Sequence, residues 1–376
     1  MRRRNVLMAG FGLGGLVVLA LVVLAGGVFR LPGQRPAGAT LVSPAPSAVP
    51  SPSIPASPDG NAVSASPPPV AAGPGARAGA ALIYDPEDHG VLLFGGAASV
   101  TTPDGHNPSI TLGDTWLWDG RSWRQLDVQG PGARSAAMVA YDSVRHVVVL
   151  FGGSGPGGVG QGLYFQDTWT WDGVQWQLRH PAHMPNPRMR AGMAFDEHHG
   201  VIVMFGGEGE TTTYTATWTW DGVDWTLLDP TTTPPARRFF GMAYDMARGV
   251  TVLFGGSFGA ARLNDTWTWD GTDWTRQPVA APSARGWTQL AYDGRTRDIV
   301  GYVYFASDSE PLAEYTVVWD GTKWTDRTGA QDPTPRAEVR MTYDPDTGQV
   351  VLYGPTSETW IWDGTAWAWW EPAAVT

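Results

Sequence analysis

Six arginines recur once in each copy of a sequence repeat, and they are the strongest candidates for a binding role. Each lies eight residues before the aspartate of an aromatic–aspartate pair, as Arg134 does before Tyr141-Asp142. A ring of guanidinium groups could attract an anionic ligand such as a carboxylate or an acidic sugar. The candidate ligand-binding residues, expected around the mouth of a central channel, are Arg77, Arg134, Arg188, Arg237, Arg285 and Arg336.

The same arginines could instead stabilise the protein. An acidic residue directly precedes the Thr-Trp step of four repeats, whereas the other two repeats have Ala216 and Tyr315 at that place. Arginine–carboxylate pairs would use both sets of charges. We favour this pairing over ligand binding, and we then expect Arg188 and Arg285 to lack a carboxylate within their own repeat. The four carboxylates are Asp114, Asp167, Asp265 and Glu358.

Neither a cofactor nor a metal site is predicted. The chain has no cysteine, which excludes disulfides and copper–thiolate chemistry. Four of its seven histidines fall in expected hairpin turns of different repeats, and a His180-x-x-His183 pair lies in an expected loop. Turn residues explain these positions without a metal. We identify no catalytic motif and expect no enzymatic activity, although scattered acids such as Glu208 and Glu310 leave a hydrolase open.

The repeat is a ten-residue segment with the pattern Thr-Trp-x-Trp-Asp-Gly followed by a further tryptophan. The aspartates of the Trp-Asp-Gly steps, at 119, 172, 221, 270, 320 and 363, are spaced by 53, 49, 49, 50 and 43 residues. Alternation of tryptophan and threonine predicts a strand, and Asp-Gly predicts a tight hairpin turn. A run such as Val147 to Phe151, ending at a glycine pair, predicts a second, buried strand.

Each repeat therefore predicts four antiparallel strands, and sheets this apolar on both faces must stack against one another. The unit resembles the kelch repeat of the kelch and galactose-oxidase-central-domain-like propellers, with its apolar run, double glycine and spaced aromatics. The resemblance covers roughly Gly75 to Pro372 and implies an all-β, six-bladed kelch-type β-propeller. The fifth and sixth repeats depart from it, with Val303-Tyr304 and Gly354-Pro355 in place of the double glycine, and should be the least regular.

The resemblance also bears on activity. Galactose oxidases use a copper ion with a cross-linked tyrosine–cysteine pair, which a chain without cysteine cannot form. Sialidases are six-bladed as well, but their Asp-box only loosely resembles Trp-Asp-Gly-x-x-Trp. A sialidase-like, glycan-active hydrolase is thus the alternative to a binding module, and a sugar-binding lectin with exposed aromatics such as Trp287, Trp369 or Trp370 is another.

The chain before the repeats has two parts. Residues 1–30 begin with three arginines, and Val6 to Phe29 carries no charge, which is long enough to span a bilayer with the N-terminus in the cytoplasm. Residues 31–74 are rich in Pro, Ala and Ser and predict a disordered linker. We expect an uncleaved signal anchor, with a cleaved signal peptide and a secreted protein as the alternative. Residues 75–376 form the propeller.

Charge and loop lengths suggest the kind of partner. Of 25 Lys and Arg residues, five lie in the first 58 residues, which contain no acid, so the rest carries 20 basic and 36 acidic residues. Nucleic acid is a poor partner for such a domain. The connections between second and third strands, such as Ala97–Gly113, are long and dissimilar, as recognition loops are. We therefore expect a bacterial, membrane-tethered, extracytoplasmic and monomeric propeller that binds a protein or a cell-surface glycan.

Overall fold

The computed structural model describes residues 73–370 except 101–107, 157–162, 280–285, 306–312 and 335. The predicted anchor (1–30), almost all of the predicted linker (31–74) and the candidate Arg285 lie outside these residues. Within the described part, no helix is both long and apolar enough to cross a membrane. Residues 65–376 form one compact unit, and the description below concerns this unit alone.

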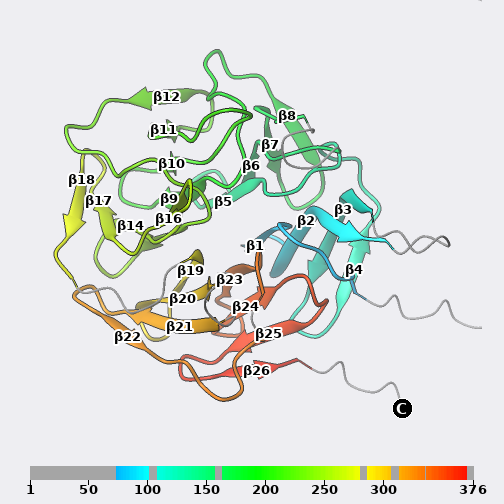
Figure 1. Cartoon of the computed structure of the whole chain (residues 1–376). Helices are drawn as coiled ribbons and strands as arrows, with labels where there is room; N and C mark the ends of the chain where they lie inside the picture. Colours follow the sequence, from blue (N-terminus) through cyan, green and yellow to red (C-terminus); the bar gives the residue numbers. More distant parts are fainter. Residues whose placement is uncertain are drawn as a thin grey trace, which may run out of the picture. The chain divides into compact units, whose positions relative to one another are not determined.

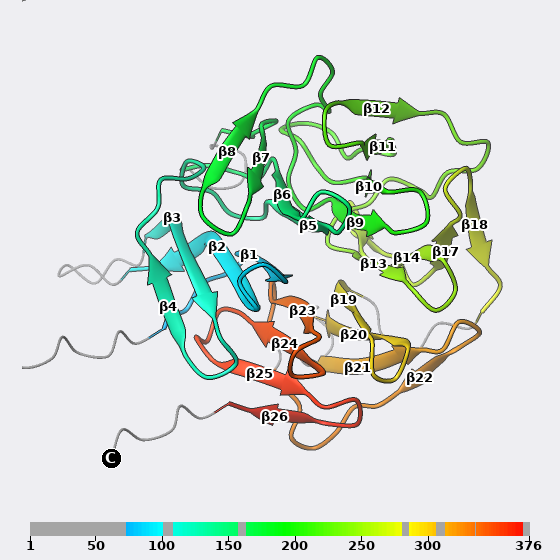
Figure 2. The same cartoon turned by 180° about the vertical axis from the view of Figure 1, so that it is seen from behind.

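The unit is an all-β, six-bladed propeller, as predicted (Figure 1). Each blade is a four-stranded antiparallel meander of strands that are consecutive in the chain, apart from a small added hairpin in the fourth blade. The first strands of the blades, β1, β5, β9, β13, β19 and β23, surround the middle of the ring, and the fourth strands lie at its outside (Figures 1 and 2).

Blade 1 consists of β1 (Ala81–Asp85), β2 (Gly90–Ser99), β3 (Ser109–Trp118) and β4 (Trp123–Leu126). Blade 2 consists of β5 (Met138–Asp142), β6 (Val147–Phe151), β7 (Thr168–Trp171) and β8 (Trp176–Arg179). Blade 3 consists of β9 (Gly192–Asp196), β10 (Val201–Phe205), β11 (Thr217–Trp220) and β12 (Trp225–Leu228).

Blade 4 consists of β13 (Gly241–Asp245), β14 (Val250–Phe254), β17 (Thr266–Trp269) and β18 (Trp274–Gln277), and its added hairpin of β15 (Ser257–Phe258) and β16 (Ala261–Arg262). Blade 5 consists of β19 (Trp287–Asp293), β20 (Asp298–Phe305), β21 (Ala313–Trp319) and β22 (Trp324–Asp326). Blade 6 consists of β23 (Arg340–Asp344), β24 (Gln349–Tyr353), β25 (Thr359–Trp362) and β26 (Trp367–Trp369).

Strand direction divides the connections between two faces. The short turns that join first to second strands and third to fourth strands lie on one face, which we call the turn face. The connections from second to third strands and from blade to blade lie on the opposite face, the loop face. This division is the one predicted from the sequence.

The apolar runs are continuous because each sheet is buried on both sides. In β6, Val148 and Leu150 belong to a cluster shared with blade 1, whereas Val149 and Phe151 belong to a cluster shared with blade 3. Successive side chains of a strand point to opposite faces, so both sets must be apolar. Six such clusters occupy the six interfaces between neighbouring blades.

One hydrogen bond recurs at every interface. The tryptophan that opens the fourth strand donates its indole N–H to the threonine that precedes the first tryptophan position in the third strand of the preceding blade. The Nε1–Oγ1 distances run from 2.8 to 3.1 Å, and the pairs are Trp176–Thr115, Trp225–Thr168, Trp274–Thr217, Trp324–Thr266, Trp367–Thr316 and Trp123–Thr359. The last pair joins blade 1 to blade 6, so the ring closes with the bond used everywhere else.

The double glycine also serves the contact between blades. Gly95 and Gly96 have φ values of 65° and 103°, which glycine adopts without strain. A Cβ on Gly95 would lie 2.5 Å from the carbonyl oxygen of Arg134 in blade 2. The N–H of Gly96 donates to that same carbonyl, and Gly153, Gly207 and Gly256 make the corresponding bonds to their next blades. Blades 5 and 6 lack the double glycine, so they cannot make this contact with the next blade in the same way.

Two predicted boundaries are wrong. In blade 1, the loop expected over Ala97–Gly113 is partly strand, because β2 and β3 continue past the double glycine through a register shift between Phe94 and Gly96. Glycines at positive φ accommodate such a bulge. The innermost strands were expected to start at the arginines, but in the five blades whose arginine is described they start four residues later, as Gly192 does after Arg188.

The recurring indole bond can be measured by a double-mutant cycle at one interface. Trp225→Phe and Thr168→Val each remove one partner of the bond and keep much of the buried volume. We expect a coupling of about 1 kcal/mol between the two substitutions in chemical denaturation. Trp123→Phe with Thr359→Val should give a similar coupling, since the closing interface uses the same bond. A coupling near zero at both interfaces would contradict this role.

Candidate ligand-binding site

The five described arginines of the predicted ring are buried, with exposed fractions of 0 to 5 % for Arg77, Arg134, Arg188, Arg237 and Arg336. In blades 1 to 4 the Nη1 group donates to the carbonyl of the first glycine in the double-glycine step, at 2.9 to 3.0 Å. The arginine therefore fixes the start of the inner strand to the end of the second strand.

Four of these arginines pair with the carboxylates predicted for them. Arg134 binds Asp167 through two parallel bonds of 2.7 and 2.9 Å, and the indole N–H of Trp169 donates to the same carboxylate at 2.7 Å. Arg77–Asp114 and Arg237–Asp265 repeat the arrangement, whereas Arg336 binds Glu358 through Nη2 alone and donates from Nη1 to Thr356. Burial alone would raise the pKa of Asp167, but the Arg134 and Trp169 bonds outweigh it and hold that pKa below its ordinary value.

Blade 3 lacks the carboxylate. Ala216 occupies the position of Asp167, and Arg188 has no acidic partner among the described residues, as predicted. Burial lowers the pKa of Arg188 to about 10, and the ring of Tyr214 lies 4.1 Å from its guanidinium carbon. The indole N–H of Trp218 is buried without a partner, whereas an aspartate at position 216 would accept its hydrogen bond. Alanine at this position thus leaves the Trp218 indole without a partner and Arg188 without an acid, although Arg188 keeps its bonds to the carbonyls of Gly206 and Asn186.

The two repeated aspartates close turns. Asp142, at the end of β5, accepts the backbone N–H groups of Val144 and Arg145 at 3.2 and 3.0 Å. Asp172, in the Trp-Asp-Gly step, accepts those of Val174 and Gln175. Turn geometry accounts for their fixed place in all six repeats.

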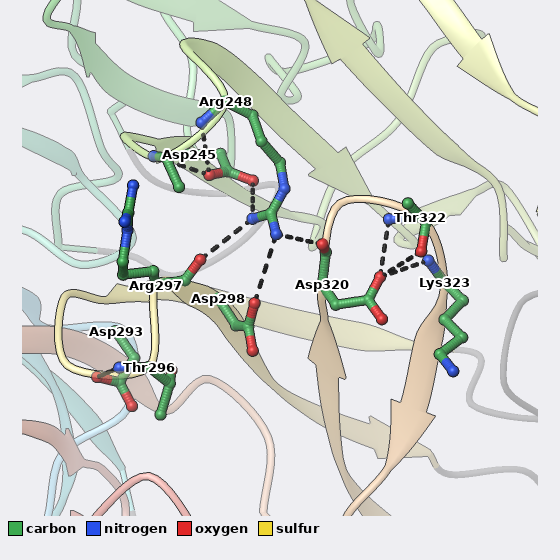
Figure 3. Close-up of polar contacts among 10 residues, drawn as sticks. Asp245, Arg248, Asp293, Thr296, Arg297, Asp298, Asp320, Thr322 and Lys323 are labelled. Carbon is green, nitrogen blue, oxygen red and sulfur yellow. Dashed lines mark hydrogen bonds and ion pairs between the residues drawn. The ribbon is translucent and has the colours of Figure 1, made fainter.

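Histidines and arginines of the turn face link blades. His89 contacts Asp346 of blade 6 at 3.0 Å, and His146 contacts Glu87 of blade 1 at 3.1 Å. Figure 3 shows the most extensive link, in which Arg248 of blade 4 bonds Asp245 at 2.9 Å and the Arg297 carbonyl of blade 5 at 3.1 Å. Within the described ranges, no three His, Asp or Glu side chains gather as a metal site.

One match to the nucleophile motif G-x-S-x-G is present at Gly255-Gly256-Ser257-Phe258-Gly259, contrary to the prediction that no catalytic motif occurs. Ser257 lies in the small hairpin of β15 and β16, and its backbone bonds to Arg238. A nucleophile elbow requires a strand-to-helix turn that exposes the serine. Ser257 is instead 2 % exposed on a hairpin, so the motif does not build that site.

A cavity of about 560 Å³ runs along the inner strands. Towards the turn face it is lined by the aromatic residues of the aromatic–aspartate pairs, which are Tyr84, Tyr141, Phe195, Tyr244, Tyr292 and Tyr343. Burial is the main cause that raises the pKa of Tyr141 to about 12, so this phenol keeps its proton at neutral pH. Of the described arginines in the predicted ring, only Arg336 lines the cavity.

The loop-face mouth of the cavity is built from the position two residues after each repeated arginine. Five of these residues have positive φ, and backbone bonds link them from blade to blade, as from Ala136 N to Gly79 O at 2.7 Å and from Arg190 N to Ala136 O at 3.1 Å. The backbone is thus repeated at five of the six positions, with Trp287 as the exception, whereas the side chains differ at every position. In order they are Gly79, Ala136, Arg190, Phe239, Trp287 and Glu338.

Charged and aromatic groups meet at this mouth. Arg190 binds Glu208 at 2.6 Å through Nη1 and Glu338 at 3.1 Å through Nε. Its guanidinium carbon lies 4.3 Å from the Phe239 ring, which in turn stacks on Trp287 with centroids 4.4 Å apart and an interplanar angle of 18°. We call Arg190, Phe239, Trp287 and Glu338 the mouth cluster. Burial would lower the pKa of Arg190, but Glu338 and Glu208 raise it above the ordinary value.

Sequence reasoning chose the repeated arginine and missed three of the four residues of the mouth cluster; Trp287 was named only as an exposed aromatic. A signal was present, since a position at fixed distance from a repeated marker holds Gly, Ala, Arg, Phe, Trp and Glu in turn. Such variety indicates a place where the scaffold does not dictate the side chain.

No protein-family model matches the chain, and a search of curated proteins finds no relative. The site therefore has to be interpreted from its own geometry.

Blade 3 has the arginine and the tryptophan but lacks the acid that binds both in blade 2, and a substitution can supply this acid. We expect Ala216→Asp to raise the free energy of unfolding by about 1–3 kcal/mol, because the new carboxylate would pair with Arg188 and accept from Trp218. Ala216→Asn is the matched control, since it can accept from Trp218 without neutralising Arg188 and should give a smaller gain. Asp167→Ala in blade 2 should cost about 3–5 kcal/mol. Equal stability of all three variants in urea denaturation would refute the pairing role.

Asp85 should make stability depend on pH. Its carboxylate is 1 % exposed with Oδ2 unpartnered, and burial is the main cause that raises its pKa from 3.8 to about 6. A raised folded-state pKa contributes stability below pH 4 that is lost as pH rises through 6. We expect Asp85→Asn to stabilise the protein by about 1–3 kcal/mol at pH 8, with the gain shrinking towards pH 4. Asp142→Asn, which weakens an ion pair to Arg145, should show no such gain.

Proposed function

We propose that the chain is a membrane-tethered, extracytoplasmic, kelch-type propeller that binds a protein or a cell-surface glycan at the loop-face mouth of its central cavity. The observation that carries the proposal is the mouth cluster, where unrepeated charged and aromatic side chains stand on a repeated backbone beside a cavity of about 560 Å³. Ligand sites are commonly apolar concavities of this size with a few placed polar groups.

The motifs and the N-terminal sequence support the other parts of the proposal. The double glycine and the spaced tryptophans are the features that resemble kelch repeats, and here they make the contacts between blades. The uncharged run from Val6 to Phe29 and the proline-rich linker support a bacterial membrane anchor that holds the propeller outside the cytoplasm. The acidic balance of the propeller argues against nucleic acid as the ligand.

In this proposal the predicted ring of arginines has a structural role. Arg77, Arg134 and Arg237 use their guanidinium groups on carboxylates and glycine carbonyls. Ligand binding by the ring stays a prediction, and we assign recognition to the mouth cluster.

A glycan is favoured among the ligands by Trp287. Its ring is half-buried at the mouth, close to the Tyr304 ring at 5.6 Å, and polar groups of Arg190 and Glu338 line the same cavity. An aromatic face beside hydrogen-bonding groups suits a sugar ring, which has an apolar face and a polar edge.

The alternative is a glycan-active hydrolase. Such enzymes place two carboxyl groups on either side of the scissile bond. Glu208 and Glu338 lie at the mouth, but both bind Arg190. Of these two only Glu338 lines the cavity, and the other acid in the lining, Glu197, follows β9 in a turn of the opposite face. This arrangement favours a binding module without turnover.

A glycan array and a panel of fluorogenic glycosides, applied to the purified full-length chain in lipid nanodiscs, test both functions. We expect binding without glycoside hydrolysis. Trp287→Ala should weaken binding by about tenfold or more, the size of a central interface residue. Trp369→Ala is the control, because Trp369 is 52 % exposed on the outer strand β26. Turnover would establish the hydrolase, and equal effects of the two substitutions would displace the site from the mouth.

A further inference from the structure

The cavity contains one charged side chain that the scaffold does not explain. Arg340 is the first residue of β23 and lines the cavity. The first residues of β1, β5, β9 and β13 are uncharged, and two of them are Gly192 and Gly241. In those two blades a Cβ would lie 2.5 Å from Phe240 and 2.4 Å from Leu290 of the next blade. The repeat therefore has no structural need for an arginine here.

Blade 1 provides the room for this side chain. Phe240 lies five residues before Asp245, and the residue five before Asp85 is Ala80. By the repeat, blade 1 therefore has a methyl group at the position where blade 4 has a phenyl ring.

Arg340 has no counterion. Among the described residues its guanidinium makes one bond, from Nη1 to the carbonyl of Val339 at 3.1 Å, and no carboxylate lies within ion-pair distance. Glu338 is the acid whose charge acts on Arg340, but its carboxylate binds Arg190. Burial lowers the pKa of Arg340, Glu338 opposes that effect and Arg190 adds to it. Arg340 is half-buried at the wall of the cavity, and a charge in such a place without a counterion favours a ligand that pairs with it.

Much of the cavity lining is apolar, although Arg190, Glu197, Arg336 and Glu338 also line it. The lining includes Met138, Met193, Met242, Met341 and Leu290, which offer no hydrogen bonds beyond weak thioether contacts. A hydrated polyanion would lose its water there without replacement. A single carboxylate on an apolar body would pair with the guanidinium and bury its body against the methionines.

We propose that Arg340 receives the carboxylate of an organic acid whose aliphatic or aromatic body occupies the central cavity. The inference deepens the proposed function, on which it rests, by naming the chemistry of the group that enters the channel. Two sources share that chemistry: a free hydrophobic acid, and the C-terminal carboxylate of a protein partner that ends in apolar residues.

Calorimetry on the purified full-length chain in lipid nanodiscs tests this proposal with two pairs of probes. One pair is 4-phenylbutyrate and its neutral amide, and the other is the tripeptide alanyl-leucyl-phenylalanine with a free and with an amidated C-terminus. We expect the acid of at least one pair to bind about tenfold or more tightly than its amide, as a charge-assisted pair requires. The pair that shows the preference identifies the source.

Three variants locate the charge. Arg340→Gln should bind acid and amide equally, and Arg340→Lys should keep part of the preference. Arg276→Gln, an exposed arginine on β18, should leave it unchanged. Equal binding of acid and amide by the wild-type chain, or a preference that survives Arg340→Gln, would overturn the proposal, and the first result does not depend on any variant folding.

The outcome separates this inference from the proposed function. If the glycan or protein ligand binds in a manner sensitive to Trp287→Ala while neither acid is preferred over its amide, the mouth is a binding site and Arg340 is not its anion receptor. If no ligand depends on Trp287 but the acid preference at Arg340 is found, the channel binds acids and the proposed function fails.

Discussion

The structure depends on a single contact that is made six times. A tryptophan at the start of each outermost strand reaches back to a threonine of the preceding blade, and its ring packs on the second tryptophan of its own blade with centroids 5.3 to 5.6 Å apart. The indole fills the apolar space between two sheets and satisfies its only polar group there. In blades 1 to 4 the phenylalanine before the double glycine packs against the tryptophan of the next blade, which completes the interface.

In blades 1, 2 and 4, the same set of bonds fixes the inner edge of the blade. The buried arginine binds a glycine carbonyl, an acidic side chain and, through that acid, a tryptophan. These bonds hold the backbone of the next two residues in one conformation, which places the side chain of the second residue at the mouth. This support does not involve the side chain at the mouth, and that side chain differs from blade to blade. The repeated arginine and the variable residue at the mouth are therefore only two positions apart in sequence, but they have different physical roles.

The blade count and the strand order could be predicted because they follow from a pattern repeated six times, and the pairs Arg134–Asp167 and Arg237–Asp265 because arginine and acid recur together in four repeats. Ala216 even marked the blade whose arginine would lack a carboxylate. The mouth cluster was missed for the opposite reason: Arg190, Phe239 and Glu338 are unlike one another, and only the ring geometry brings them together. The extension of β2 to Ser99 was also missed, since the bulge at Gly95 and Gly96 hides a strand that continues beyond two glycines. Arg340 carried no visible signal, because its lack of a counterion can be seen only in three dimensions.

Each blade is complete within its own stretch of chain, and no strand is exchanged where the first and last blades meet. That junction is held by side chains and by single bonds such as Tyr84 N to Thr342 Oγ1 at 2.9 Å and Tyr353 OH to Gly75 O at 2.8 Å. Since every junction uses the same donor and acceptor, the gene segment for one blade can be duplicated, deleted or moved without inventing a new way to join its neighbours.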